Sequence, residues 1–183
     1  MTKKILLVAL AVLAAVVVVF VIVVSIQPAD FRITRSATMS AAPADVFAQV
    51  NDFHNWNAWS PWAKLDPAAK NSFEGPSSGE GAVFRWAGND EVGEGSMTIT
   101  ESRPPELVGI RLDFLRPFEG TSNAEFTFKP VGDQTEVTWS MHGENNFIAK
   151  AFCMFMDMEK MLGDQFEQGL ANLKSIVETK PSD

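Results

Sequence analysis

Three patterns of apolar residues follow one another along this chain. Residues 5–24 form an unbroken apolar run, several short segments between residues 31 and 143 alternate between apolar and polar positions, and residues 147–179 repeat apolar positions at helical spacing. Such patterns are typical of a membrane-spanning helix, of strands with one buried face, and of an amphipathic helix, respectively. The sequence therefore predicts an apolar helix, then a mainly β region, then a second long helix.

The first pattern has the length and composition of a membrane span. Residues 5–24 comprise sixteen Val, Leu, Ile or Phe residues and four Ala, without a charge. As a helix the run is about 30 Å long, which matches the hydrocarbon core of a bilayer. A cleaved signal peptide is the alternative, but its apolar region is about 7–15 residues long. The one passable cleavage site, Val23-Val24-Ser25, lies at the end of the full span. We expect residues 1–26 to be an uncleaved transmembrane anchor.

The charges that flank this span predict its orientation. Lys3, Lys4 and the terminal amine precede the run, whereas Asp30, Arg32 and Arg35 follow it. The positive-inside rule places the more positive side in the cytoplasm. We therefore expect a cytoplasmic N-terminus and, after a linker at 27–30, an extracytoplasmic domain at 31–179 with a tail at 180–183.

The alternating segments predict an antiparallel sheet. Hairpin-type turns such as Gly132-Asp133 separate segments that begin 10–15 residues apart, which favours a meander. One face of this sheet is strongly apolar from Met97 to Met141, so it needs a covering element. The expected strands are 31–39, 71–75, 82–88, 92–102, 106–115, 120–131 and 134–143.

Helical segments lie on either side of these strands. Pro43 opens a short helix with Val46, Phe47 and Val50 on one face, and Trp56, Trp59 and Trp62 follow at a spacing of three. The Trp group favours packing of the short helices onto the sheet edge, with a cavity lid or membrane contact as alternatives. From Phe147 to about Thr179 we expect one long amphipathic helix that covers the sheet, bent at Gly163. Met154, Met156, Met158 and Met161 widen its apolar face, as core, as ligand lining or as a surface beside lipid or a partner chain.

Charge and composition exclude several classes of function. Lys3 and Lys4 precede the span, so the remaining chain holds 13 Lys and Arg against 23 Asp and Glu, a formal net charge of −10. Such a domain is repelled by nucleic acid and by anionic lipid headgroups. A single cysteine and two histidines do not supply a zinc or iron–sulfur ligand set. Neither Gly79-Glu80-Gly81 nor Gly93-Glu94-Gly95 has the third glycine of a dinucleotide site. We expect no cofactor and no metal.

Several local strings resemble one known superfamily. These are Ala42-Pro43-Ala44-Asp45-Val46-Phe47, Trp59-Ser60-Pro61-Trp62, Phe84-Arg85-Trp86-Ala87-Gly88-Asn89 with Val92-Gly93-Glu94-Gly95, and the closing segment from Phe166 to Lys174. Together with the element order, they resemble the START-like superfamily, in its SRPBCC or polyketide cyclase/dehydrase-like branch. The resemblance implies an α+β helix-grip fold, in which a curved antiparallel sheet wraps around a long C-terminal helix. It also implies an apolar cavity between them, and no shared catalytic motif.

The predicted function is binding of a hydrophobic small molecule or lipid in that cavity, close to the membrane. Apolar side chains would give affinity, and one or two polar groups would orient the ligand. A solid core filled by the same side chains is the alternative. The expected lining is Trp86, Met97, Phe114, Phe126, Phe128, Trp139 and Met141 from the sheet, with Phe155, Met158, Leu162 and Phe166 from the helix.

Two other functions fit the sequence. Glu101 shares the alternation phase of Met97 and Ile99, so an inward carboxylate with a raised pKa is a weak catalytic candidate for a cyclase or hydrolase. An exposed Glu at a strand end is the more ordinary interpretation. By the same alternation, His142 falls on the polar face. Alternatively, an apolar Met and Trp surface binds a membrane partner and the interior is solid, which makes the chain an interaction module.

Overall fold

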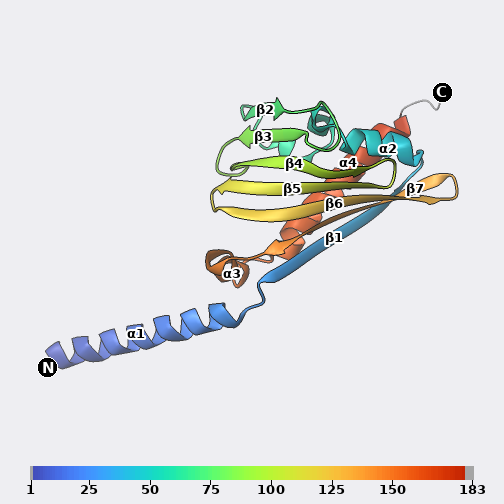
Figure 1. Ribbon diagram of the computed structural model, residues 1–183. Coiled ribbons are helices and arrows are strands. Elements are labelled where there is room, and N and C mark those ends of the chain that lie inside the picture. The colour runs from blue at the N-terminus through green and yellow to red at the C-terminus, as the bar shows by residue number, and fades with distance from the viewer. Residues whose placement is uncertain (1, 180–183) are drawn as a thin grey trace.

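The computed structural model describes residues 2–179 and consists of one helix followed by an α+β domain (Figure 1). The predicted tail at 180–183 and residue 1 of the predicted anchor lie outside the described residues. The elements are α1 (Thr2–Ile26), β1 (Asp30–Met39), α2 (Pro43–Val50), the 3₁₀ helices η1 (Phe53–Ala58) and η2 (Pro61–Lys64), β2 (Lys70–Glu74), β3 (Val83–Ala87), β4 (Glu94–Arg103), β5 (Leu107–Arg116), β6 (Gly120–Val131), β7 (Gln134–Glu144), α3 (Phe147–Cys153) and α4 (Met158–Thr179).

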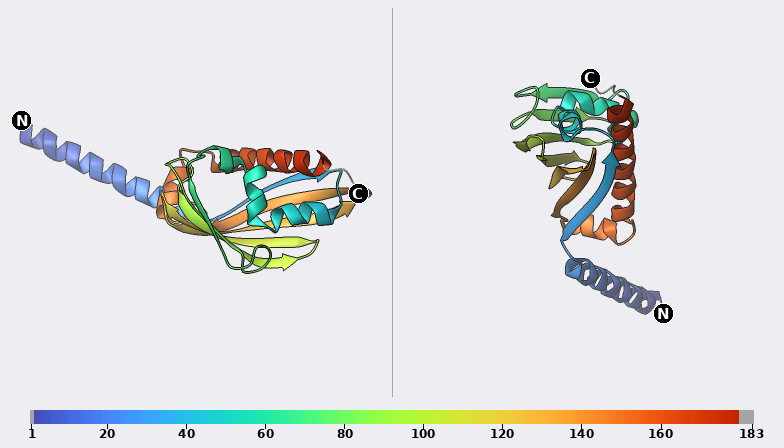
Figure 2. Two further views of the ribbon diagram at one scale, coloured as in Figure 1. Left: turned by 90° about the horizontal axis from the view of Figure 1, so that it is seen from above. Right: turned by 90° about the vertical axis from the view of Figure 1, so that its right-hand side faces the viewer.

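The seven strands form a single antiparallel sheet. Their order is β1-β7-β6-β5-β4-β3-β2, so β2 to β7 form the predicted meander and β1 pairs with the last strand. Burial alternates along β4, β6 and β7, as the apolar pattern predicts. The buried face of the sheet curves around α4, while α2 and the 3₁₀ helices close one end (Figure 2). This arrangement is the helix-grip fold expected from the sequence.

The C-terminal helical region is two helices, so the prediction of one helix over 147–179 is wrong. Helix α3 ends at Cys153 and α4 begins at Met158. A carboxylate explains the break: Oδ1 of Asp157 accepts a hydrogen bond from the backbone N–H of Lys160 at 2.9 Å, which is the arrangement of a helix N-cap. Asn146 caps α3 in the same way through the N–H of Ala149.

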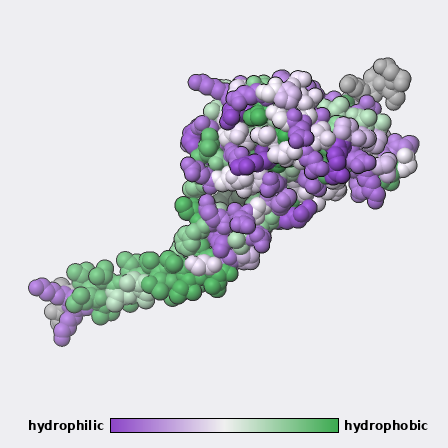
Figure 3. All heavy atoms as spheres, in the orientation of Figure 1, coloured by the Kyte–Doolittle hydropathy of each residue, from purple (hydrophilic) through white to green (hydrophobic). Residues whose placement is uncertain are grey.

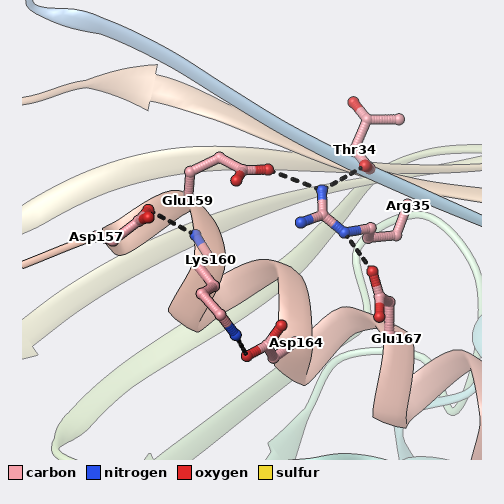
Figure 4. Close-up of polar contacts among 7 residues, drawn as sticks. All are labelled: Thr34, Arg35, Asp157, Glu159, Lys160, Asp164 and Glu167. Carbon is pink, nitrogen blue, oxygen red and sulfur yellow. Dashed lines mark hydrogen bonds and ion pairs between the residues drawn. The ribbon is translucent and has the colours of Figure 1, made fainter.

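Helix α4 runs without a break through Gly163, where the sequence predicted a bend. Gly163 makes room for Arg35, which crosses from β1 to the helix (Figure 4). The Arg35 Nε donates to Glu167 Oε1 at 2.8 Å, and Nη1 donates to Glu159 Oε1 at 2.9 Å. The guanidinium group thus joins two positions on α4, about two turns apart, to the edge strand.

Helix α1 is long and apolar enough to cross a membrane by length and composition. Most of its side chains are exposed, but Val24, near its C-terminal end, is fully buried. Close by, Lys150 Nζ of α3 donates to the carbonyl oxygen of Ser25 at 3.3 Å. The end of α1 therefore lies against α3, at one end of the domain.

Candidate functional site

Three of the predicted lining residues form a closed aromatic stack between the sheet and α4. The ring of Trp139 on β7 stacks on Phe166 of α4 at 4.1 Å and on Phe126 of β6 at 4.7 Å between ring centroids. All three side chains are buried. Gly169 allows this approach, because a Cβ there would lie 2.8 Å from Cζ3 of Trp139. This part of the interior is filled, as the solid-core alternative expects.

The predicted tryptophan group completes the stack. Trp56 and Trp59 are buried, and both meet Trp139 edge to face, with centroids 6.4 and 5.9 Å away. Their indole N–H groups are paired, Trp56 with the carbonyl of Val50 at 2.9 Å and Trp59 with that of Gln49 at 3.4 Å. The packing interpretation of this group is therefore confirmed, although the tryptophans reach the middle of the sheet rather than its edge.

One polar atom in this stack stands out. The Nε1 of Trp139 is buried and has no hydrogen-bond partner among the described residues. A buried donor without an acceptor costs about 1–3 kcal/mol. An acceptor atom on a bound molecule would remove that cost. This indole N–H can therefore donate a hydrogen bond to a ligand.

A half-buried apolar wall continues the core beyond the stack. Trp86 of β3 and Phe114 of β5 meet edge to face at 6.1 Å, and the Trp86 ring lies over Gly95, where a Cβ would be 2.6 Å from its Cζ2. Unlike Trp139, Trp86 has its N–H paired, with the carbonyl of Val92 at 3.1 Å. The members of this apolar wall pack against the core and are partly exposed: Trp62, Phe84, Trp86, Leu112, Phe114 and Leu162.

The remaining predicted lining residues lie in different places. Met97 and Met141 are buried in the sheet, and Met158 is half-buried at the start of α4. Phe128 packs against Phe47 of α2 at 5.6 Å, away from the wall. Phe155 lies in the turn between α3 and α4 and is 78 % exposed, so its placement on the inner face of the helix is corrected. The break before Asp157 explains the difference.

The lining predicted from the sequence lacks three members of the wall, and the sequence does not indicate the unpaired indole N–H of Trp139. Leu112 shares the alternation phase of the buried Val108 and Ile110 on β5, and Phe84 shares that of the buried Ala82, just before β3. Trp62 belongs to the tryptophan group that the sequence predicts to pack on the sheet. Register identifies the first two, because Met97 pairs with both Phe84 and Leu112. The unpaired Trp139 N–H has no signal in the sequence, since it depends on the absence of an acceptor nearby in space.

Two open pockets lie outside this interface. One, of about 550 Å³, is formed where β1, β6 and β7 meet and is lined by Asp30, Phe31, Arg32, Thr121, Asn123, His142, Gly143 and Glu144. His142 is half-buried there and its Nδ1 has no partner among the described residues. The other, of about 180 Å³, lies between the end of α1 and α3. Neither pocket is between the sheet and α4.

The candidate catalytic carboxylate is on the surface. Glu101 is exposed and forms an ion pair with Arg103 at 2.8 Å. Alternation places it in phase with Ile99, but a bulge between Ile99 and Glu101 shifts the register, so Ile99 pairs with Ile110 and Glu101 with Gly109. The inward Glu101 of the catalytic alternative is therefore wrong, and the more ordinary interpretation, an exposed Glu at a strand end, is the one that the structure has. Shifted pKa values occur at surface ion pairs instead: hydrogen bonding from Arg85 lowers the pKa of Glu74, and hydrogen bonding from Arg111 lowers that of Asp113.

Comparison with known proteins agrees with this architecture. A family model described as "Polyketide cyclase / dehydrase and lipid transport" matches residues 30–178. The chain belongs to this family. Membership suggests binding of a hydrophobic ligand, and the matched segment begins at β1, directly after α1 and its linker. Among curated proteins, none matches the chain significantly.

Solved structures from several sources share the fold of this polyketide cyclase and lipid-transport family member. The Aha1 dimer from Colwellia psychrerythraea is 16 % identical, with a TM-score of 0.60 over 83 % of this chain and 99 % of that one. Ara h 8.0201 is 12 % identical, with a TM-score of 0.58 over 82 % and 99 %. The di-domain ARO/CYC BexL from the BE-7585A biosynthetic pathway is 16 % identical, with a TM-score of 0.60 over 86 % and 53 %. At these identities the likeness concerns the fold.

Proposed function

We propose that this chain binds a hydrophobic small molecule or lipid between the sheet and α4, while α1 anchors it in a membrane. The observation that carries this proposal is the buried Nε1–H of Trp139 at the centre of that interface, which has no hydrogen-bond partner within residues 2–179. The ligand would combine an apolar body with an oxygen that accepts a hydrogen bond from this indole. Such a division, with many apolar contacts and few polar ones, is usual in small-molecule sites.

The apolar wall supports the proposal because it offers partly exposed apolar surface for a ligand to cover. Its six members pack against the hydrophobic core and remain partly exposed, so a ligand that covers them gains about 25 cal/mol for each Å² of apolar surface removed from water. Trp62 links the wall to the polar group, because its ring is 5.9 Å from that of Trp139 and 6.4 Å from that of Phe166.

The position of the anchor supports a lipid-like ligand. Three residues separate the end of α1 at Ile26 from the start of β1 at Asp30. The tether is therefore short, and the domain stays close to the bilayer that α1 would cross. A ligand drawn from that bilayer would have a short path to the domain. With the N-terminus in the cytoplasm, as the flanking lysines favour, the domain faces the extracytoplasmic side.

Quantitative extraction of bound lipophilic molecules tests the proposal. The full chain, purified in detergent and transferred to amphipol, is extracted with organic solvent, and the extract is quantified by mass spectrometry per mole of protein. Leu162→Glu places a charge in the apolar wall, whereas Ala171→Glu places the same charge on an exposed position of α4 and serves as the matched control. Lipids that surround α1 contribute equally to all three samples.

We expect the wild-type and Ala171→Glu proteins to carry one more mole of one lipophilic class than Leu162→Glu. Near-UV circular dichroism should show the same tertiary packing in all three proteins. Equal extracts, together with no uptake of an added fluorescent fatty acid by the wild-type protein, would contradict the proposal.

A second candidate function is favoured by one observation. The turn after α3 exposes a cluster of large apolar side chains, with Phe155 the most exposed of them. An interaction module with a solid core predicts such a surface. The two functions are compatible, because the exposed cluster and the apolar wall are different sets of residues.

A further inference from the structure

Helix α3 and the turn that follows it carry an unusual concentration of exposed apolar side chains. None of the residues of α3 is buried, although most of them are apolar. We call the following six residues the α3 patch; each is between 39 and 78 % exposed: Phe147, Ile148, Phe152, Met154, Phe155 and Met156. Contiguous apolar surfaces of this kind mark sites that contact a protein or a membrane.

The α3 patch lies beside the end of the apolar helix. Lys150 of α3 bonds to the Ser25 carbonyl at 3.3 Å, and the small pocket between them is lined by Gln27, Pro28, Asn145, Lys150, Cys153 and Met154. Both ribbon views place α3 next to the C-terminal end of α1 (Figures 1 and 2). In the space-filling view, the hydrophobic atoms of α1 lead up to hydrophobic atoms at this end of the domain (Figure 3).

The β5–β6 turn extends the same apolar surface. Phe118 is 43 % exposed, and its ring contacts that of Phe152 with 5.1 Å between centroids. Leu115, at the end of β5, is 52 % exposed. Two segments far apart in the sequence therefore present apolar side chains at the end of the domain where α1 is attached.

We propose that the α3 patch lies in the interfacial layer of the bilayer, with the domain resting on the membrane through α3 and the β5–β6 turn. This inference rests on the anchoring part of the proposed function, because α1 fixes where the bilayer must be. If α1 spans the hydrocarbon core, its C-terminal end reaches the headgroup region, and α3 lies at the same level. Amphipathic segments in this position bury their apolar side chains at the boundary between headgroups and acyl chains.

The charges near the patch favour neutral lipid as the occupant. Residues 147–156 contain one charged side chain, Lys150, whose amino group points to the end of α1. A long lysine side chain at this depth keeps its charge in the headgroup layer while its methylene groups stay in apolar surroundings. The chain after Lys4, with Lys150 included, carries a formal net charge of −10, so attraction to anionic lipid does not hold the domain on the surface. Apolar contact with a zwitterionic bilayer remains as the source of binding.

The position of Cys153 makes a direct test available. It is the one cysteine of the chain, it is exposed, and it ends α3 within the patch region. The full chain carries a nitroxide at Cys153 and is reconstituted in phosphatidylcholine vesicles, and vesicle flotation first establishes that it is bound. Power saturation then compares collisions with oxygen, which concentrates in lipid, and with a water-soluble nickel chelate. The matched control carries the label at Asp133→Cys in a Cys153→Ser background, on the β6–β7 turn.

The proposal predicts that the label at Cys153 collides mainly with oxygen and the label at position 133 mainly with nickel. Equal nickel access at both positions in floated vesicles would overturn this inference and leave the anchor intact. Protection of Cys153 from both reagents would also overturn it, in favour of a contact with a second protein chain. Failure of the full chain to float would overturn both the anchor and this inference.

A pair of variants separates insertion from mere proximity. Phe155→Asp removes the most exposed apolar side chain of the patch, whereas Val131→Asp makes the same change at a 47 % exposed position at the end of β6. Both positions are exposed, so both variants should fold. We expect Phe155→Asp to lower the oxygen-to-nickel ratio at Cys153 at least twofold and Val131→Asp to leave it unchanged. Equal ratios in the two variants would contradict insertion.

Discussion

Arg35 occupies the space that a side chain at Gly163 would need. A Cβ built on Gly163 collides with the guanidinium group of Arg35, which lies across α4 on its way to Glu159 and Glu167 (Figure 4). The Arg35 guanidinium group is held by two ion pairs, so moving aside would cost it its contacts with Glu159 and Glu167. The glycine thus lets the long helix and the edge strand approach closely enough for the ion pairs to form.

Gly163→Ala should therefore destabilise the protein, although the same change stabilises an open helix by about 1 kcal/mol. We expect the free energy of unfolding to fall by about 1–3 kcal/mol, the usual cost of overpacking. Urea unfolding of the full chain in micelles, followed by tryptophan fluorescence, measures this, because all five tryptophans lie in the domain.

Gly163→Ala should have the opposite effect on the free energy of unfolding once Arg35 is removed. In an Arg35→Ala background, Gly163→Ala should raise the free energy of unfolding relative to Arg35→Ala alone. A double-mutant cycle gives the coupling directly. Additive effects of the two substitutions would show that Gly163 serves some purpose other than the approach of Arg35.

Trp139→Phe should weaken ligand binding more than it weakens the fold. The variant removes the indole N–H that lacks a partner, so the affinity for a fluorescent fatty acid should fall about 3–10-fold, the value of one hydrogen bond. The loss of stability should be smaller than for Trp139→Ala, for which about 3–5 kcal/mol is usual. Trp59→Phe is the matched control, since its N–H is already paired with the Gln49 carbonyl. A similar loss of affinity in both variants would count against a role for the Trp139 N–H.

Asp113 should contribute to stability in a pH-dependent way. Hydrogen bonds from Arg111 at 2.9–3.1 Å and from Thr121 at 2.8 Å hold the pKa of Asp113 below its ordinary value. Because the pKa is lower in the folded state, the contribution is present above the pKa of the unfolded chain and is lost as the pH falls through the folded value.

Asp113→Asn should thus be slightly less stable than the wild type near neutral pH, and the difference should vanish in strong acid. Thermal unfolding of both proteins from pH ~7 down to pH ~2 measures this difference in stability. Arg111→Gln should lose the same pH dependence, because it removes the arginine whose hydrogen bonds lower the pKa of Asp113 most. A difference between Asp113→Asn and the wild type that stays constant over this range would contradict the assignment.

Much of the fold is readable from the sequence because sheet and turn signals are local. The turn at Gly132, whose φ is +64°, marks the β6–β7 hairpin within one residue, and alternation gives the buried faces of β6 and β7. The apolar pattern does not indicate the break between α3 and α4, since Phe152 and Phe155 continue the apolar spacing across it. Asp157 was the available signal, because an Asp within a helical run can begin a new helix by capping it.

The candidate site was less readable because it depends on register and on distant neighbours. The bulge after Ile99 turns Glu101 outward, and alternation alone does not indicate a bulge. Phe126, Trp139 and Phe166, predicted as cavity lining, lie between the sheet and α4, and the close stacking that fills this space follows from their ring orientations. The exposure of Phe155 follows from the helix break. The Asp157 cap therefore accounts both for the division into α3 and α4 and for the exposed position of Phe155.

A hydrophobic molecule bound between the sheet and α4 would place an oxygen at the Trp139 indole N–H. The most direct measurement is the two-dimensional ¹H–¹⁵N spectrum of the indole groups of the full chain in nanodiscs, with Trp139 assigned through Trp139→Phe, while a fatty acid is added. Five indole signals are expected from the sequence. We predict that the Trp139 signal shifts downfield more than the other four and saturates at one equivalent. A Trp139 signal that stays in place while the fatty acid binds would contradict the account.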